Sequence, residues 1–206
     1  MTPTLYISPG ACATASHVAL QEAGIPHEIR IVNLRTGEQR TPEYLAVNPA
    51  GVTPALQTDQ GVITQNAAIL AWAAQTQPQA GLAPVDDAFA FARFNAFNGW
   101  LASSLHPALG KVLFSRPPLE GEARDQAIEQ AQAKLDLAEA HYVEGPWVFG
   151  DTWTLADGYL MVFERWSRQA GLLDPARFPK LNAHLDAVQQ REAVQRTLAA
   201  EGLSAI

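Results

Sequence analysis

Strand and helix patterns alternate over the first 76 residues of the chain, and helical patterns alone follow. The segment at 4–7 is apolar and strand-like, and the alanine-rich stretch at 14–23 is typical of a helix. Gly24 then takes the place of the glycine that commonly follows a helix C-terminus. Because strands and helices must each bury an apolar face, this alternation predicts a small layered α/β unit.

The next segments complete this unit. Isoleucine alternates with charged residues over 27–32, which predicts a half-buried strand. Thr41 and Pro42 suit the cap and the first residue of a short helix. Asp59-Gln60-Gly61 separates two apolar runs and predicts a hairpin, and a helix is expected over about 66–75. The resulting order, βαβ-α-ββα, is the thioredoxin-like arrangement, which we assign to residues 1–77.

The rest of the chain is predicted to be helical. Residues 78–85 carry two prolines and one glycine without hydrophobic periodicity, so we expect a linker there. Residues 86–206 are expected to form an all-α, helical-bundle domain, because apolar positions recur three or four residues apart. Thr154 and Asp157 have the spacing of a capping box, and Pro179 opens another helix.

Composition and charge exclude several kinds of function. The formal net charge is −7, and the 14 Lys and Arg residues are scattered, so we expect no nucleic-acid partner. No apolar run is long enough to span a membrane, and the N-terminus shows no signal-peptide pattern, so a reducing cytoplasmic location fits best. Four histidines lack metal-ligand spacing, so neither a metal site nor a bound cofactor is expected: His17, His27, His141 and His184.

Cys12 is the only cysteine, and it lies where the first strand meets the first helix. The positive end of a helix dipole favours thiolate over thiol, so this position predicts a lowered pKa for Cys12. A lone cysteine is also often a small buried apolar residue, and that alternative stays open. Ala15 stands where a C-x-x-C motif would have its second cysteine, so a dithiol cycle is excluded.

Two further loops have residues suited to a ligand. A cis bond between Thr53 and Pro54 would leave the Thr53 N–H and C=O free to pair with an extended peptide, whereas the alternative is a plain turn. Gln65 can donate to and accept from a charged ligand terminus, and Asn66 can cap the following helix. Because such ends tend to share one edge of a small α/β sheet, we expect these residues and Cys12 to lie together.

These motifs resemble those of bacterial cytosolic glutathione transferases, and of the beta class most. The resemblance spans nearly the whole chain and implies α/β plus all-α architecture, with an N-terminal thioredoxin-like domain and a C-terminal helical domain, usually in a homodimer. It is carried by Ser8-Pro9-Gly10-Ala11-Cys12, Asn48-Pro49-Ala50-Gly51 with Thr53-Pro54, Gln65-Asn66-Ala67-Ala68-Ile69-Leu70, Leu105-His106, Thr154-Leu155-Ala156-Asp157, Arg191-Glu192-Ala193-Val194 and Ala200-Glu201-Gly202-Leu203.

The resemblance also implies roles for individual residues. Cys12 would contact the glutathione sulfur and could form a mixed disulfide with it. His106 would reach the site from the second domain and assist, with Trp166 packed behind the site. The glutathione-binding residues that it implies are Arg35, Thr53, Pro54, Gln65, Asn66 and Asn98.

Three positions depart from the family pattern. Asn66 stands where serine is common. Gly99 stands where the beta class has asparagine, with Asn98 next to it, and Pro107 replaces a basic residue that sometimes follows the histidine. These departures predict weaker binding of glutathione.

The function implied is conjugation of glutathione, as co-substrate, to hydrophobic electrophiles. Glutathione-dependent thiol–disulfide exchange through Cys12 is a second activity, because cysteine suits it better than serine or tyrosine would. The alternative is a non-catalytic ligand-binding or regulatory protein that keeps the same fold.

Overall fold

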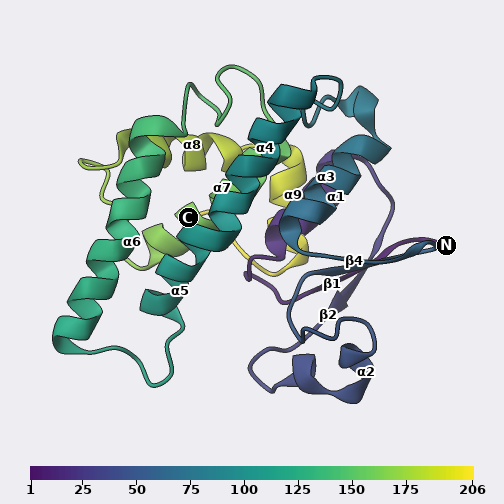
Figure 1. Cartoon of the computed structure of the whole chain (residues 1–206), viewed down its shortest axis with the longest axis horizontal. Coiled ribbons are helices and arrows are strands. Elements are labelled where there is room, and N and C mark those ends of the chain that lie inside the picture. Colours follow the sequence, from purple (N-terminus) through teal and green to yellow (C-terminus); the bar gives the residue numbers. More distant parts are fainter.

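A four-stranded sheet with its own helices lies beside a group of longer helices in the computed structural model, which describes residues 1–206 (Figure 1). The strands are β1 (Thr4–Ile7), β2 (Glu28–Ile31), β3 (Ala55–Thr58) and β4 (Gly61–Thr64). Their order in the sheet is β2-β1-β3-β4. Strand β1 pairs in parallel with β2 and antiparallel with β3, and β3 and β4 form the predicted hairpin.

The helices of this first part lie on both faces of the sheet. Helices α1 (Thr14–Glu22) and α3 (Asn66–Thr76) pack together on one face, and the short α2 (Pro42–Leu45) lies on the other (Figure 1). A separate small apolar cluster fills the α2 face: Tyr6, Val32, Tyr44 and Ala55. The Thr41 hydroxyl accepts from the Tyr44 N–H at 3.4 Å, which confirms the predicted cap. There are also two short 3-10 helices: η1 (Glu38–Arg40) lies between β2 and α2, and η2 (Pro78–Ala80) follows α3.

The half-buried character predicted for residues 27–32 is wrong, although the strand is present. All four residues of β2 are exposed, and Ile31 keeps 57% of its surface in water. The physical reason is that β2 is an edge strand with a neighbour on one side only, so fewer side chains cover it. Only Val32, just after the strand, is buried.

The remaining elements are helical, as predicted. They are α4 (Ala88–Trp100), the π-helical segment η3 (Leu101–Leu105), α5 (His106–Leu113), α6 (Gly121–His141), α7 (Leu155–Gln169), α8 (Pro179–Gln189) and α9 (Glu192–Ala200). The fold is therefore an N-terminal thioredoxin-like domain followed by an all-helical domain. No helix is both long and apolar enough to cross a membrane.

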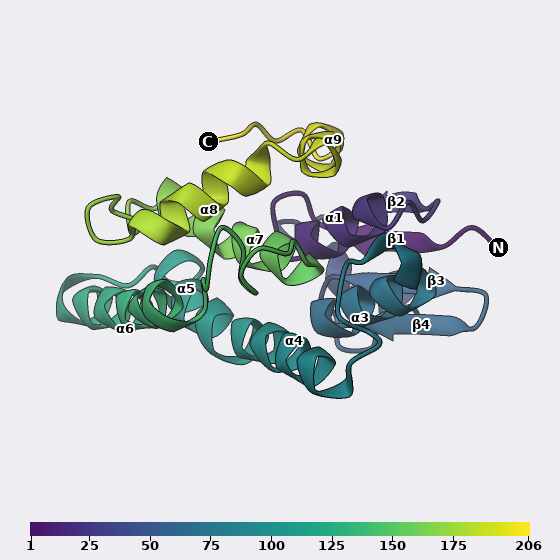
Figure 2. The same cartoon turned by 90° about the horizontal axis from the view of Figure 1, so that it is seen from above.

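Helix α7 connects the two parts. It is buried from Leu155 to Ser167 and packs against α1 and α3 as well as α4, α5 and α8 (Figure 2). Its start has the predicted capping box, in which the Thr154 N–H donates to the Asp157 carboxylate at 2.7 Å. One hydrophobic core extends through both parts. The division into residues 1–77, 78–85 and 86–206 stays a prediction.

The chain widens into a π-helical turn between α4 and α5. Pro107, near the start of α5, cannot donate a backbone N–H, and a proline ring crowds the carbonyl one turn earlier. A π-type turn spaces the backbone more widely, and such turns recur at functional sites. This turn ends directly before His106, the first residue of α5.

Candidate active site

The thiol of Cys12 lies in the loop between β1 and α1. The loop turns through Gly10, whose φ of 73° favours glycine, and the Ala11 N–H donates to the Ser8 carbonyl at 3.0 Å. The Cys12 Sγ donates to the carbonyl oxygen of Thr53 at 3.7 Å. Cys12 is half-buried and packs against the main hydrophobic core. The structure thus brings Cys12 and Thr53 together, as the sequence predicted.

The prediction of a lowered pKa for Cys12 is wrong. Burial raises the pKa of the Cys12 thiol to about 11, and hydrogen bonds from Asn66 and from nearby backbone offset only part of this effect. The helix field does not prevail because Cys12 precedes Thr14, the first residue of α1, and no charged group compensates the loss of water. At neutral pH Cys12 is therefore a neutral thiol that donates a hydrogen bond.

The Thr53–Pro54 peptide bond is cis, as predicted. Thr53 is buried, with 8% of its surface exposed, and its backbone N–H has no acceptor within the protein. The preceding carbonyl, of Val52, accepts from the Tyr44 hydroxyl at 2.7 Å and from the Asn48 side-chain amide at 2.6 Å. These two bonds hold the loop, so the free N–H of Thr53 has a fixed place beside the thiol.

The prediction that Asn66 caps helix α3 is wrong. Asn66 is the first helical residue, and Gln65 precedes it with a positive φ of 73°, an uncommon conformation for a residue other than glycine. The side chain of Asn66 is buried instead, and its Oδ1 accepts from the Ser16 hydroxyl at 2.6 Å. Gln65 is exposed, so its side chain is accessible to a ligand.

His106 begins α5 and contacts two aromatic rings of α7. Its ring centroid lies 5.4 Å from that of Phe163 and 5.3 Å from that of Trp166. Burial lowers the pKa of His106, so the imidazole is neutral at pH 7. The Nε1 of Trp166 donates to the Gly10 carbonyl at 2.9 Å, which connects this aromatic group to the loop that carries Cys12. Trp166 packs behind the loop, as expected.

Tyr159 of α7 belongs to the same neighbourhood, and the sequence reasoning missed it. Burial raises the pKa of its hydroxyl, and the nearby Cys12 thiol raises it further when ionised. Asn66 acts through hydrogen bonding on both Tyr159 and Cys12. The signal in the sequence was the spacing of Tyr159 from the capping box, which places it one turn into a buried helix.

Two other predicted residues stand apart from these contacts. Arg35 lies in the exposed turn after β2, and its backbone N–H donates to the Asn33 side chain at 3.0 Å. Asn98 is on α4 with 0% of its surface exposed, and neither of its side-chain polar atoms has a hydrogen-bond partner. Contact of Arg35 and Asn98 with glutathione stays a prediction, and for Asn98 it requires movement of α4 or of the side chain.

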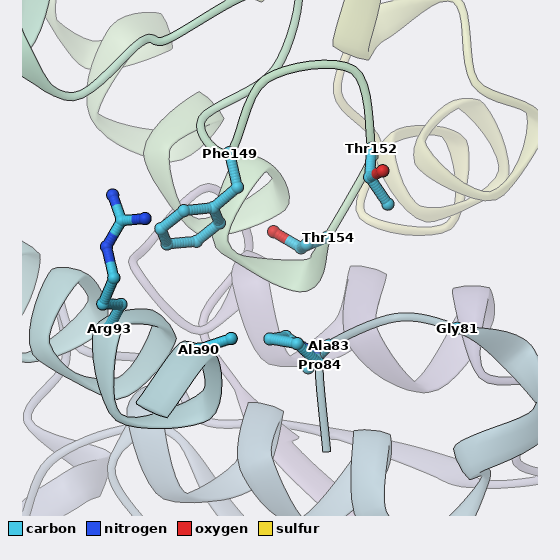
Figure 3. A pocket seen from close by; sticks show the side chains of 8 residues that line it. All are labelled: Gly81, Ala83, Pro84, Ala90, Arg93, Phe149, Thr152 and Thr154. Atoms are coloured by element: carbon cyan, nitrogen blue, oxygen red, sulfur yellow. The ribbon is translucent and has the colours of Figure 1, made fainter. Parts of the chain in front are cut away.

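A hollow of about 400 Å³ lies elsewhere, where residues after η2 meet α4 and the loop before α7 (Figure 3). The rings and side chains of Phe149 and Arg93 form one wall, and Thr152 and Thr154 lie on the loop opposite the linker residues (Figure 3). It includes none of the predicted site residues: its lining consists of Gly81, Ala83, Pro84, Ala90, Arg93, Phe149, Thr152 and Thr154. This hollow is therefore distinct from the thiol site.

A thioredoxin-like domain with a thiol between β1 and α1, joined to an all-helical domain, is the architecture of glutathione S-transferases. Residues 10–76 match the glutathione S-transferase N-terminal domain, and residues 121–187 match the C-terminal domain. The chain is also 37% identical over 205 residues to glutathione S-transferase GST-4.5 of Xanthomonas campestris pv. campestris, covering 97% of this chain and 99% of that protein. The chain belongs to the glutathione S-transferase family, which confirms the prediction from the sequence motifs.

Solved structures agree with this assignment. A sphingomonad glutathione S-transferase complexed with glutathione has a TM-score of 0.87 and 34% identity, covering 98% of this chain and 100% of that one. The beta-class glutathione S-transferase of Sphingomonas chungbukensis has a TM-score of 0.86 and 33% identity, covering 98% and 100%. The chain is thus similar to bacterial, beta-class members of the family, as predicted.

Proposed function

We propose that this protein conjugates glutathione to hydrophobic electrophiles at the site around Cys12. The observation that carries the proposal is the pairing of Cys12 Sγ with the Thr53 carbonyl, next to the unpaired N–H of Thr53. An extended peptide can pair with one backbone N–H and one C=O of a single residue, in the manner of strand addition. The backbone of the cysteinyl residue of glutathione would pair with the N–H and C=O of Thr53 in this way, and its sulfur would lie next to Cys12.

Binding of glutathione would change the partner of the Cys12 thiol. Once the ligand N–H donates to the Thr53 carbonyl in place of Cys12, the S–H of Cys12 is free to donate to the glutathione sulfur. A donated hydrogen bond stabilises the charged form of its acceptor, so it lowers the pKa of the glutathione thiol. A neutral cysteine, which burial produces here, is the form that can donate this bond.

The chemical step is a substitution or addition at carbon. The glutathione thiol loses its proton, and its sulfur forms a bond to the electrophilic carbon. In a substitution a leaving group departs with the bonding electrons. In an addition the electron pair of the attacked double bond moves onto the acceptor, which then takes up a proton. His106 is neutral because burial lowers its pKa, so its imidazole can accept that proton. Gln65 and Asn66 would hold the γ-glutamyl end, and Arg35 the glycyl carboxylate.

Aromatic side chains support a hydrophobic second substrate. Phe114 follows α5 with 56% of its surface exposed, and its ring centroid lies 5.1 Å from that of Trp166. His106 contacts the same tryptophan ring. The exposed ring of Phe114, next to the tryptophan that contacts the thiol loop, would bind a flat, apolar electrophile.

Thiol–disulfide exchange through Cys12 is the second activity we propose. The Cys12 thiolate would attack a glutathionylated substrate, form a mixed disulfide with glutathione and release the substrate thiol. A second glutathione thiolate would then release oxidised glutathione and restore Cys12. Because the attacking group must be a thiolate, a pKa of about 11 makes this route slow at neutral pH.

We also propose a cytoplasmic homodimer. Phe89, at the start of α4, leaves 77% of its surface exposed, and aromatic residues are enriched in interfaces. Light scattering at low micromolar concentration would give the mass of two 22.2 kDa chains. A monomer mass would contradict this part of the proposal.

The test of the proposed function compares wild type with Cys12→Ala and Cys12→Ser. Calorimetric titration with glutathione and a conjugation assay with an aryl halide would be run in parallel. We expect binding and turnover in the wild type, loss of most turnover in Cys12→Ala, and partial retention in Cys12→Ser, whose hydroxyl can still donate. A wild type that neither binds glutathione nor turns over would favour the non-catalytic alternative.

A further inference from the structure

The backbone N–H and C=O of Gly10, two residues before Cys12, both bind residues of the helical domain. Its N–H donates to Oε2 of Glu201 at 2.9 Å, and its carbonyl accepts from Nε1 of Trp166 at 2.9 Å. Trp166 comes from α7. Glu201 directly follows α9, and α9 lies beside α1 (Figure 2).

Glu201 makes two further contacts with α1. The Thr14 hydroxyl donates to the same Oε2 at 2.8 Å, and the Nδ1 of His17 lies 2.9 Å from Oε1. The side chain of Glu201 has no exposed surface. One buried carboxylate therefore binds residues on both sides of Cys12 in the sequence, at positions 10 and 14.

The charged surroundings of Glu201 come from two elements. His17 faces it from α1, and Arg165 faces it from α7, where the carboxylate raises the pKa of Arg165 against the larger effect of burial. Arg165 itself donates to the side chain of Gln189 and to the carbonyl of Ser204. On the side of the thiol, the ionisable neighbour is Tyr159 of α7.

The C-terminal segment also lies close to the thiol loop. Gly10 has a positive φ, and a Cβ added there would lie 3.6 Å from the Leu203 side chain, so the C-terminal segment covers it closely. Loss of the carboxylate would leave the part-buried N–H of Gly10 and the buried hydroxyl of Thr14 without acceptors, which is costly. The loop would then move to reach water.

We propose that Glu201 and Trp166 are positioning residues for Cys12, holding the half-buried thiol loop in place from the second domain. They act through the Gly10 peptide and do not touch the substrate. The inference adds to the proposed function, but it concerns the thiol alone and can be tested without glutathione.

The test is the pH dependence of Cys12 alkylation by iodoacetamide, which is specific because the chain has one cysteine. The variants are Glu201→Ala, Glu201→Gln and Trp166→Phe. Gln keeps an acceptor for Gly10 and Thr14, and Phe keeps an aromatic ring but loses the N–H. Glu192→Ala is the control, because its side chain is 90% exposed on α9.

In Glu201→Ala the freed loop would expose the thiol, so we expect the midpoint of alkylation to fall by about one pH unit, equal to about tenfold more thiolate at pH 8. The KM for glutathione would rise while kcat changes less. Glu201→Gln would restore most of the wild-type profile, Trp166→Phe would shift it less, and Glu192→Ala would not shift it.

An unchanged alkylation profile in folded Glu201→Ala would overturn the inference. If that variant does not fold, Trp166→Phe decides: a profile equal to wild type would also overturn it. A role confined to stability would lower the melting temperature without moving the alkylation midpoint, and that result counts against the inference as well.

Discussion

The Sγ of Cys12 and the carbonyl oxygen of Thr53 lie 3.7 Å apart, with the thiol as donor. The bond joins the loop before α1 to the loop before β3 and occupies the carbonyl that a bound peptide would need. In the proposed function, ligand binding would release the thiol through one exchange of hydrogen bonds. The thiol enters that exchange in its neutral form, because burial raises its pKa to about 11.

The first prediction concerns the reactivity of this thiol in the free protein. Since the thiolate is the nucleophile, alkylation of Cys12 should be slow at pH 7–8 and should rise toward pH 11. Mass spectrometry of samples that are quenched at set times during reaction with iodoacetamide measures this rise, and free glutathione is the reference thiol. A midpoint below pH 8 would show that the helix field prevails over burial.

His106 provides the second prediction. Because burial lowers its pKa, the imidazole is already neutral at pH 7, and raising the pH further should not change its state. His106→Asn should lower kcat by about tenfold or more if the imidazole takes the proton. Steady-state kinetics between pH 6 and 9 tests this, with Phe163→Leu as a control for packing alone. A kcat equal to wild type would remove His106 from the mechanism.

A third prediction concerns the pair formed by Ser16 and Asn66, whose side chains lie 2.6 Å apart. Ser16→Ala leaves the buried Oδ1 of Asn66 without its donor, at a cost of about 1–3 kcal/mol. We expect a lower melting temperature and a higher KM for glutathione, because Asn66 adjoins Cys12. Restoration by Ser16→Thr would identify the hydroxyl as the cause, whereas an unchanged KM would separate Asn66 from the ligand site.

The fourth prediction concerns a buried charge cluster in the helical domain. His184 Nε2 lies 3.0 Å from the Asp157 carboxylate, and Nδ1 lies 2.9 Å from Glu164, with no side-chain surface exposed. Burial lowers the pKa of His184, but the two carboxylates more than offset it and raise the pKa to about 10. His184→Gln should therefore cost about 3–5 kcal/mol, since it leaves buried carboxylates without a cation.

The sign of the pH effect follows from this raised pKa. The stability that protonated His184 provides is complete below pH 6.5, its ordinary pKa, and is lost as pH rises toward 10. Burial also raises the pKa of Glu164, which acts in the same direction. Thermal unfolding should show that the difference in melting temperature between wild type and His184→Gln is smaller at pH 10 than at pH 6. An equal difference at both pH values would contradict a charged His184 between the two carboxylates.

Local patterns were enough to predict most of the fold. The cap at Thr41, the hairpin at 59–61 and the capping box at Thr154 each depend on residues close in sequence, and all three form as predicted. The exposure of Ile31 was not predictable in this way. An alternating strand has the same pattern at the centre and at the edge of a sheet, and only the strand order distinguishes the two.

The site was less predictable because its energetics depend on distant residues. The pKa of Cys12 is raised by burial in the folded protein, and the sequence around Cys12 contains only the opposing helix effect. Asparagine is a residue type that often caps helices, yet the Asn66 side chain accepts a hydrogen bond from Ser16 of the neighbouring helix instead. Glu201 lies 191 residues from Gly10, so no local pattern could connect them.

The central claim is that glutathione binds with its backbone on Thr53 and its sulfur beside Cys12. A crystal structure of the wild-type protein with glutathione tests it most directly. We predict that the Thr53 N–H and C=O pair with the cysteinyl residue and that the Cys12 Sγ leaves the Thr53 carbonyl for the glutathione sulfur. Glutathione bound elsewhere, or bound with Cys12 still paired to Thr53, would contradict this account.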